Sequence, residues 1–436
     1  MNIFYISQFF LPENIAAAFR AKETAVVWGK RGHEVTVLTG YPNYPTGKLF
    51  PGYSLSLLSE DKSFSEEGIR VLRSKLSIKD NTSFLHRVWN ALSFFFYGTW
   101  NVLFRLKKRM PKPQVVVASS GTIFAGLLGW IASLRFRCPL IFEIRDITFK
   151  QLLATGKSPR SLSYKGMRFL ELFLCRRAKR VVVVTHGFQT ILEENGIPKG
   201  KIRVITNGVD VSVTEKKDTG EFIVSYFGTL GISQNLRQLF PYFDVISSCV
   251  PRSKLLLIGE GAEKEKLRQE IALSQRNDRE LLDGVTAAEL EPYYGISAMS
   301  VAVLNPSDNF RYTLPSKIFQ IMGRGIPLLF VGPKGEAAEI IDGAGAGLTL
   351  TGTEEENRNK LATFFSTPHW EQDLKKMGEN GAALVREQYS RKKLAEAYLE
   401  ILSEIAEPFS WVADPDDRKR TDAGKSGENK AYSKRN

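Results

Sequence analysis

The chain has 436 residues, of which 43% are hydrophobic and 25% are charged, so it has the composition of a globular protein and the length of two ordinary domains. Its three cysteines, Cys138, Cys175 and Cys249, cannot all pair and have no metal-ligand spacing, and its four histidines are widely separated. These features argue against a disulfide-rich domain and a metal site, and they favour a reduced, cytoplasmic location. We expect neither a signal peptide nor a membrane span, because no basic start and no sufficiently long apolar run is present.

The net charge of +13 is unevenly distributed along the chain. Residues 1–210 contain 31 Lys and Arg against 14 Asp and Glu, a balance of +17, which leaves −4 for the remainder. Residues 81–142 contain eight basic residues and no acidic residue. We therefore expect the first half to meet anions such as phosphates, nucleic acid or an anionic membrane surface.

A strand–helix–strand pattern opens the chain. Asn2–Ser7 and Glu34–Leu38 are predicted strands, and a predicted helix runs from Ala16 to Lys30 between them. This order indicates a βαβ unit and hence a parallel sheet. The first strand is not followed by GxGxxG, the mark of a classical dinucleotide site. The small residues at 16–18 either admit a phosphate or sugar to the helix start or serve only its packing against the sheet.

Two aromatic segments follow. Residues 40–47 include two prolines and two glycines and must form a loop, whose tyrosines either bind a sugar or lipid or cover the core. Residues 84–109 predict a helix rich in Phe and Trp that ends in a basic cluster. This helix is too polar to span a bilayer and is suited to lie in the interface of an anionic membrane. The alternative is a buried helix with a solvated basic end.

Charged residues follow a later strand of the first half. Pro139–Ile144 is a predicted strand, and Arg145 and Asp146 come directly after it. The carboxyl ends of parallel strands are where such sheets bind ligands, so these two residues are candidates for a site. The turn signal at 207–210 ends this part of the chain, and we place a domain boundary there.

The α/β pattern then restarts and predicts a second doubly wound domain. The strands Phe222–Phe227 and Lys254–Ile258 are each followed by a loop with two glycines. The loop residues predicted to face a ligand are Gly228, Thr229, Gly231, Gly259, Glu260 and Gly261. Both loops lie at the carboxyl edge, where a ligand is expected.

A polar loop ending in Leu314 and Pro315 leads into a further predicted helix, with Ser316 as the expected N-cap. The start of this helix directs unpaired N–H groups and a positive dipole end toward whatever precedes it. Lys317 and Arg311 add charge, so we predict an anion site here. The alternative is an ordinary capped helix.

These elements divide the chain into four parts. Residues 1–210 are expected to form a first Rossmann-like domain, and 211–387 a second Rossmann-like domain. Residues 388–412 form a helix that can cross back to the first domain, and the charged tail 413–436 is expected to be disordered because it lacks large apolar residues.

Two tandem α/β domains with a cleft between their carboxyl edges resemble the GT-B fold. The chain resembles bacterial family 4 glycosyltransferases of the O-antigen, capsule and colanic-acid type. The resemblance rests on six segments in this order: 30–48, 143–146, 207–210, 259–261, 314–319 and 335–339. Each segment alone is weakly specific, but the order and spacing are specific for the family.

The resemblance implies a nucleotide-sugar donor, with UDP as the preferred nucleotide, that is bound mainly by the second domain. It also implies retention of configuration without metal or cofactor. Gln320 stands where family members carry a Glu that binds the nucleotide ribose, and Tyr312 stands where they carry an acid that faces the donor sugar. Lys317 and Arg311 are then expected to hold the diphosphate, while Arg145 and Asp146 orient the acceptor or the sugar. The implied acceptor is a polyprenyl-diphosphate-linked glycan, presented at the cytoplasmic face of the plasma membrane.

Two other functions compete with sugar transfer. The neutral Gln320 and Tyr312 favour a catalytically weak subunit that binds nucleotide-sugar and serves in assembly. A sugar epimerase of GT-B fold would need no lipid acceptor. Nucleic-acid binding explains the charge of the first half but not the cleft motifs, so we do not expect it.

Overall fold

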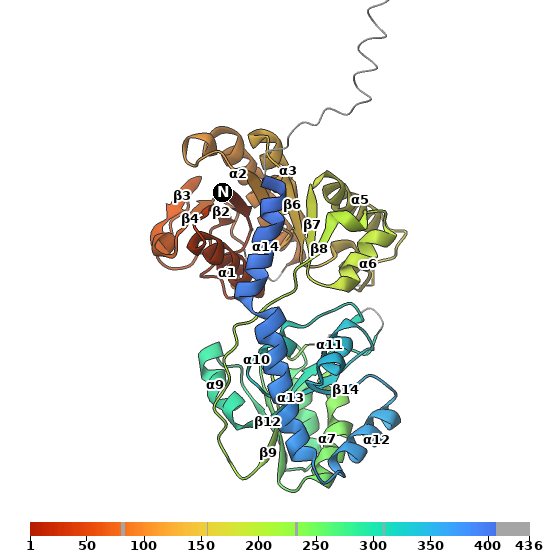
Figure 1. The fold of residues 1–436 in the computed structure, drawn as a ribbon. Coiled ribbons are helices and arrows are strands. Elements are labelled where there is room, and N and C mark those ends of the chain that lie inside the picture. The colour runs from red at the N-terminus through yellow and green to blue at the C-terminus, as the bar shows by residue number, and fades with distance from the viewer. Residues whose placement is uncertain (80–82, 155, 232–233, 308–309, 407–436) are drawn as a thin grey trace, which may run out of the picture.

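The computed structural model describes residues 1–79, 83–154, 156–231, 234–307 and 310–406, which form two α/β domains, one above the other in Figure 1. The predicted doubly wound α/β fold is confirmed, with eight strands in the first sheet and six in the second. The predicted disordered tail at 413–436 lies outside the described residues. Within these ranges no helix combines the length and the apolar character needed to cross a membrane.

The first sheet has the strand order β3-β4-β2-β1-β5-β6-β7-β8 and is parallel except for the pair β3–β4. Its strands are β1 (Asn2–Ile6), β2 (Glu34–Gly40), β3 (Leu58–Asp61), β4 (Ile69–Ser74), β5 (Val115–Ser119), β6 (Leu140–Ile144), β7 (Arg180–Val183) and β8 (Ile202–Val204). Its helices are α1 (Ala16–Lys30), α2 (Phe84–Phe104), α3 (Ile123–Phe136), α4 (Thr148–Ala154), α5 (Leu162–Arg177) and α6 (His186–Glu194). The chain order reverses between β1 and β5, so their carboxyl ends flank the point where such sheets bind ligands.

The central strands are apolar on both faces because helices cover both faces. Phe4 and Ile6 of β1 belong to one core cluster with residues of α2, α3 and α5. Ile3 and Tyr5 belong to another cluster with residues of α1 and of α14 (Arg391–Ala406). Alternate side chains of a strand point to opposite faces, which accounts for this division.

The edge strand β3 and its neighbour β4 were not identified from the sequence. Arg73 interrupts the apolar pattern of β4, yet its side chain is fully buried. Its guanidinium pairs with Asp61 of β3 at 3.0 Å and donates to the Gly40 carbonyl at 3.1 Å. The charge is thus satisfied inside the domain, where it fixes the end of β2.

The second sheet has the order β11-β10-β9-β12-β13-β14 and is parallel throughout. Its strands are β9 (Phe222–Phe227), β10 (Ser253–Ile258), β11 (Arg279–Leu282), β12 (Ser297–Val303), β13 (Leu328–Val331) and β14 (Gly347–Leu350). Its helices are α7 (Phe240–Cys249), α8 (Lys264–Leu273), α9 (Ala287–Ile296), α10 (Ser316–Gly323), α11 (Glu336–Ala344), α12 (Glu354–Phe365) and α13 (Trp370–Leu384). The order reverses between β9 and β12, so the loops after these two strands meet at the ligand-binding edge.

The last described helix, α14, lies against the first domain although it follows the second in the sequence (Figure 1). Trp28 of α1 donates a hydrogen bond from Nε1 to the Ala395 carbonyl at 3.1 Å, and its ring lies 5.2 Å from that of Tyr398. Where the chain returns, Val209 forms a parallel bridge with Ser390. The chain therefore passes between the domains twice, near Val209 and near Ser390, and these two segments lie side by side.

Candidate functional site

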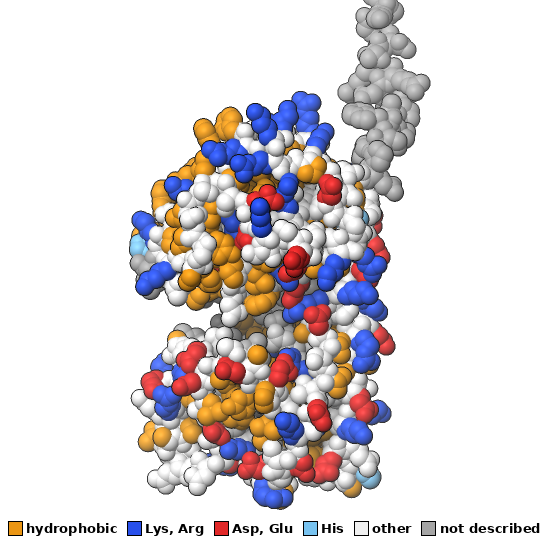
Figure 2. Space-filling view, turned by 90° about the vertical axis from the view of Figure 1, so that its left-hand side faces the viewer, with side chains coloured by type: hydrophobic (Ala, Val, Ile, Leu, Met, Phe, Trp, Pro, Cys, Tyr) orange, Lys and Arg blue, Asp and Glu red, His pale blue; other side chains and the backbone are white. Residues whose placement is uncertain are grey.

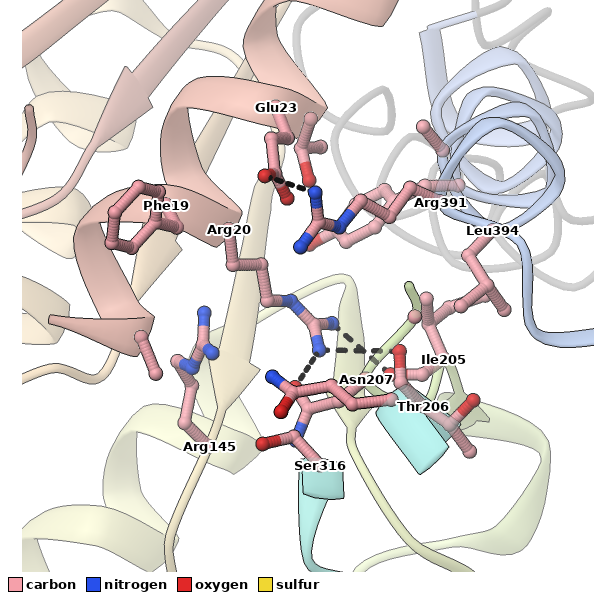
Figure 3. A pocket seen from close by; sticks show the side chains of 16 residues that line it. Phe19, Arg20, Glu23, Arg145, Ile205, Thr206, Asn207, Ser316, Arg391 and Leu394 are labelled. Atoms are coloured by element: carbon pink, nitrogen blue, oxygen red, sulfur yellow. Dashed lines mark hydrogen bonds and ion pairs between the residues drawn. The ribbon is translucent and has the colours of Figure 1, made fainter. Parts of the chain in front are cut away.

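Two adjoining cavities lie between the domains, in the hollow visible in Figure 2. The first, of about 160 Å³, is lined by α1, the segment after β8, the start of α10 and α14 (Figure 3). The second, of about 320 Å³, is lined by the start of α1, the loops after β5 and β6, and Thr313 and Leu314. Arg145 and Asn207 line both cavities.

Arg145 provides a cation at the junction of the two cavities. Its backbone N–H donates to Ser120 Oγ at 3.0 Å, which fixes the loop after β6. Its Nη1 atom is buried and has no hydrogen-bond partner among the described residues. Burial and the neighbouring Arg20 guanidinium lower the pKa of Arg145, while Glu143 opposes them. A buried donor without a partner beside a cavity is suited to an anionic ligand. Asp146, the other predicted residue of this loop, is exposed and lines only the second cavity.

Arg20 is a site residue that sequence reasoning missed. Its guanidinium forms an ion pair with the buried Glu143 at 2.9 Å and donates to Asn207 Oδ1 at 2.6 Å (Figure 3). Burial raises the pKa of Glu143, but the Arg20 and Arg145 charges and the hydroxyls of Ser119 and Tyr5 outweigh it and hold that pKa below its usual value. Glu143 therefore stays a carboxylate, and Arg20 links α1 to the interdomain segment. No local pattern marks Arg20 in the sequence, because its partners are distant along the chain.

A second set of ion pairs ties α14 to the same region. Arg391 at the start of α14 pairs with Glu23 of α1 at 2.6 Å and with Asp210 at 3.1 Å. Figure 3 shows Arg391 and Arg20 side by side at the cavity, each facing a carboxylate or amide partner. These ion pairs join α1, the interdomain segment and α14 at the cavity wall.

The glycine loops of the second domain pack against each other. Gly228 N–H donates to the Ile258 carbonyl at 2.9 Å, and Leu230 N–H donates to the Glu260 carbonyl at 2.8 Å. A Cβ atom at Gly259 would overlap the Gly228 carbonyl, and one at Gly261 would overlap the Leu230 carbonyl. These glycines are required because two backbones approach closely.

Other predicted members of the loops are already paired. The Thr229 carbonyl accepts from the Tyr226 hydroxyl at 2.7 Å. The Glu260 carboxylate pairs with Lys264 at 2.6 Å and accepts from Gly284 N–H at 2.9 Å. A Cβ at Gly231 would meet the Gln234 side chain. The loops therefore present backbone rather than charged side chains to the cleft.

The start of α10 differs in one detail from the prediction. Pro315, and not Ser316, is the N-cap, and it offers no side-chain hydrogen bond. Ser316 is instead the first helical residue and lines the first cavity with Gln320. The first N–H groups of the helix thus lack a side-chain cap, which leaves them available to a ligand.

Lys317 points away from that cavity, toward the end of β9. Its Nζ donates to the Phe227 carbonyl and lies 3.8 Å from the centre of the Tyr226 ring. Among the described residues no carboxylate forms an ion pair with it. Burial lowers the pKa of Lys317 to about 7. A Cβ at Gly228 would overlap Nζ, so the predicted glycine loop and lysine do lie together.

The loop before α10 contacts the first domain. Tyr312 packs on the core of that domain, and a Cβ at Gly187 of α6 would overlap its ring. Each carboxylate oxygen of Glu336 accepts one backbone N–H at 3.0 Å, from His186 and from Gly187. A carboxylate of the second domain therefore caps a helix of the first. Arg311 is exposed, with its guanidinium 5.0 Å from the Tyr312 ring, and it lines neither cavity.

Residues 16–208 match the family model described as "Glycosyl transferase 4-like domain". The matched residues make up most of the first domain. This confirms the resemblance to family 4 glycosyltransferases that the sequence motifs indicated. The chain matches no curated protein in sequence.

Solved structures extend the likeness to both domains. Anabaena Alr3699/HepE in complex with UDP and glucose is 17% identical with a TM-score of 0.63, covering 93% of this chain and 100% of that one. Sucrose-phosphate synthase (tll1590) from Thermosynechococcus elongatus is 15% identical with a TM-score of 0.64, covering 93% and 98%. The lipopolysaccharide outer core galactosyltransferase WaaB in its apo form is 14% identical with a TM-score of 0.60, covering 93% and 100%. The shared arrangement is the two-domain GT-B fold.

Proposed function

We propose that the protein is a retaining, metal-independent glycosyltransferase that moves a sugar from a nucleotide-sugar to a glycan carried on polyprenyl diphosphate. The observation that carries this proposal is the Nη1 atom of Arg145, which has no hydrogen-bond partner among the described residues. It lies at a cavity that also receives the start of α10. Both groups attract anions, and they belong to opposite domains. UDP is the preferred nucleotide, since the HepE structure of similar fold contains UDP.

The chemistry requires charge stabilisation on the donor side. Breaking the anomeric C–O bond leaves negative charge on the diphosphate, and donors placed beforehand around that charge lower the barrier. Lys317, the backbone of the loop starting at Gly228 and the N–H groups of α10 would supply them. Gln320 would hydrogen-bond the ribose through its amide.

The acceptor would approach from the first domain. Arg145 and Asp146, with the uncapped start of α1, line the second cavity on this side. They would hold the acceptor against the anomeric carbon. In a retaining transfer the leaving phosphate can take the acceptor proton, so the reaction needs no separate protein base.

We also propose that α2 holds the first domain on the cytoplasmic face of the plasma membrane. Five of its large apolar side chains are exposed at helical spacing, and they are Leu85, Trp89, Phe96, Trp100 and Phe104. We call these five residues the apolar stripe. The exposed basic residues that follow α2 are Arg105, Lys107, Lys108 and Arg109. In Figure 1, α2 lies at the end of the first domain that is remote from the second. Aromatic and basic side chains together favour the interface of an anionic membrane.

Thermal shift with nucleoside diphosphates and sugar nucleotides tests the donor assignment. A ligand that binds the native state raises the melting temperature by mass action, so the base that stabilises most is the one recognised. Transfer from the best sugar nucleotide to a polyprenyl-diphosphate-linked glycan then tests the reaction. If the donor binds but is neither transferred nor hydrolysed, the proposal that the protein is an enzyme is rejected.

That last outcome would support a catalytically weak subunit, the second candidate. Tyr312 favours it, because this residue packs against the first domain in place of an acid that could face the donor. Gln320 favours it too, because an amide makes a weaker ribose contact than a carboxylate.

A further inference from the structure

A groove on the first domain lies beside α2 and outside the interdomain site. It is formed by the segment after β4 and one face of α2, and its lining includes Lys75, Leu76, Trp89, Ser93, Phe96 and Tyr97. The groove encloses about 430 Å³. This volume holds roughly three five-carbon isoprene units if each carbon takes the ~30 Å³ of a water molecule.

The groove opens within the apolar stripe. Trp89 and Phe96 form part of its lining and are 49% and 59% exposed. Trp100 and Phe104 continue the stripe beyond the groove and are 52% and 62% exposed. If the stripe lies in the membrane interface, a single hydrocarbon chain can pass from the bilayer into the groove without crossing water.

The groove also has a cation suited to a phosphate. Lys75 Nζ lies 5.4 Å from the centre of the Tyr97 ring, and within the described part of the chain it forms no ion pair with a carboxylate. On the α2 side of the groove the sequence has no acidic residue between 81 and 142. An isoprenoid diphosphate combines one apolar chain with a strongly anionic end, and it matches this arrangement better than a two-chain glycerolipid does.

A buried polar network joins the groove to the interdomain site. Ser77 N–H donates to Ser93 Oγ at 2.7 Å, and Asn90 Nδ2 donates to the Ser77 carbonyl at 3.0 Å. Asn90 in turn accepts from Gln8 Nε2 at 2.8 Å, and Gln8 accepts from Thr122 at 2.7 Å. The loops that carry Gln8 and Thr122 also carry Phe9 and Gly121, which line the second cavity. The groove floor is therefore rigidly connected to the loops expected to receive the acceptor.

We infer that this groove binds the isoprenoid chain of the lipid-linked acceptor next to its diphosphate, with Lys75 beside the phosphates. The inference rests on the proposed function, since it identifies where the acceptor of that reaction is held. It assigns Trp89 and Phe96 to lipid recognition, and it leaves Trp100 and Phe104 to membrane contact alone.

Binding of farnesyl diphosphate to the full chain, measured by calorimetry without membranes, tests the groove directly. Lys75→Ala and the double variant Trp89→Ser/Phe96→Ser should each weaken binding at least tenfold. The matched control Trp100→Ser/Phe104→Ser removes two equally exposed aromatics of the same helix and should leave affinity within twofold. Unchanged melting temperatures would show that the variants are folded, since the replaced aromatic side chains lie at the surface.

Comparison probes separate the chain from the charge. Inorganic diphosphate and farnesol should bind at least tenfold more weakly than farnesyl diphosphate. Equal binding of dodecyl phosphate would overturn the assignment to an isoprenoid. Equal losses in the two double variants would overturn the assignment to the groove.

The failure of the proposed function would look different. If UDP-sugars neither bind nor react while the groove variants alone lose farnesyl diphosphate, the proposed transfer fails and the lipid site remains. If transfer proceeds but Lys75→Ala leaves KM for the lipid-linked acceptor unchanged, the groove assignment fails and the transferase remains.

Discussion

Raising the pH from 7 to 9 should weaken the binding of UDP-glucose, because the Lys317 ammonium would pair with the donor diphosphate. In the free protein Nζ is held by the Phe227 carbonyl and the Tyr226 ring, and no carboxylate among the described residues compensates its charge. Burial disfavours the charged form and lowers the pKa to about 7. Below this pH the lysine is charged and ready for the diphosphate, and above it a proton must be taken up on binding.

The magnitude follows from the protonated fraction. With a pKa of about 7, roughly one molecule in two is protonated at pH 7 and roughly one in a hundred at pH 9. If only the protonated form binds, the apparent Kd rises about fiftyfold, which corresponds to ~2.3 kcal/mol at ~1.4 kcal/mol per tenfold change. The neutral lysine can also bind the donor, but without a charge-assisted hydrogen bond, which contributes about 1.5–3 kcal/mol. The loss of binding free energy at pH 9 is therefore limited to about this size.

Calorimetry with UDP-glucose at pH 7, 8 and 9 measures this dependence, and the diphosphate diester of this probe has no proton to lose in that range. Lys317→Arg is the control, because a guanidinium stays charged and its Kd should not vary with pH. Lys317→Ala should bind and turn over more than tenfold less well at pH 7, also without pH dependence. A wild-type Kd that changes less than threefold between pH 7 and 9, or an equal slope in Lys317→Ala, would refute the reasoning.

Three further predictions concern other parts of the molecule. Gln320→Glu should preserve or raise transfer, because a carboxylate makes the stronger ribose contact, and a folded variant that has lost nucleotide binding would contradict this role. Glu336→Gln should loosen the contact between the domains at α6 and raise the radius of gyration measured by small-angle scattering. The control Glu339→Gln on the same helix should leave the radius of gyration unchanged. Equal scattering from both variants would contradict the role of Glu336. Replacing the basic cluster at 105–109 by Ser should reduce co-sedimentation with anionic vesicles, an effect that salt should mimic, and leave UDP binding intact. If the wild type ignores such vesicles at low salt, α2 is no membrane contact.

The sequence by itself determined most of the strands and helices that carry the site, though not β3 and β4, and it determined the motifs at the sheet edges. Apolar strands, glycine turns and the loop before Ser316 are local patterns, since backbone geometry and burial leave a trace in neighbouring residues. For this reason the paired loops around Gly228 and Gly259 and the cation Lys317 could be placed at one edge in advance. The N-cap was misplaced by one residue, because Ser316 and Pro315 are both compatible with a helix start.

Only the tertiary structure decided which side chains meet. Arg20 forms an ion pair with Glu143 and a hydrogen bond with Asn207, and Glu336 accepts hydrogen bonds from the start of α6. Each of these contacts joins residues more than a hundred positions apart in the sequence. The stripe on α2 illustrates the same limit, because Phe94 is fully buried and Phe96, two positions later, is exposed. Composition predicted an aromatic, basic helix, but the packing of other elements against one face decides which of its side chains are buried. Contacts between distant segments depend on how whole elements pack, and no local pattern encodes that packing.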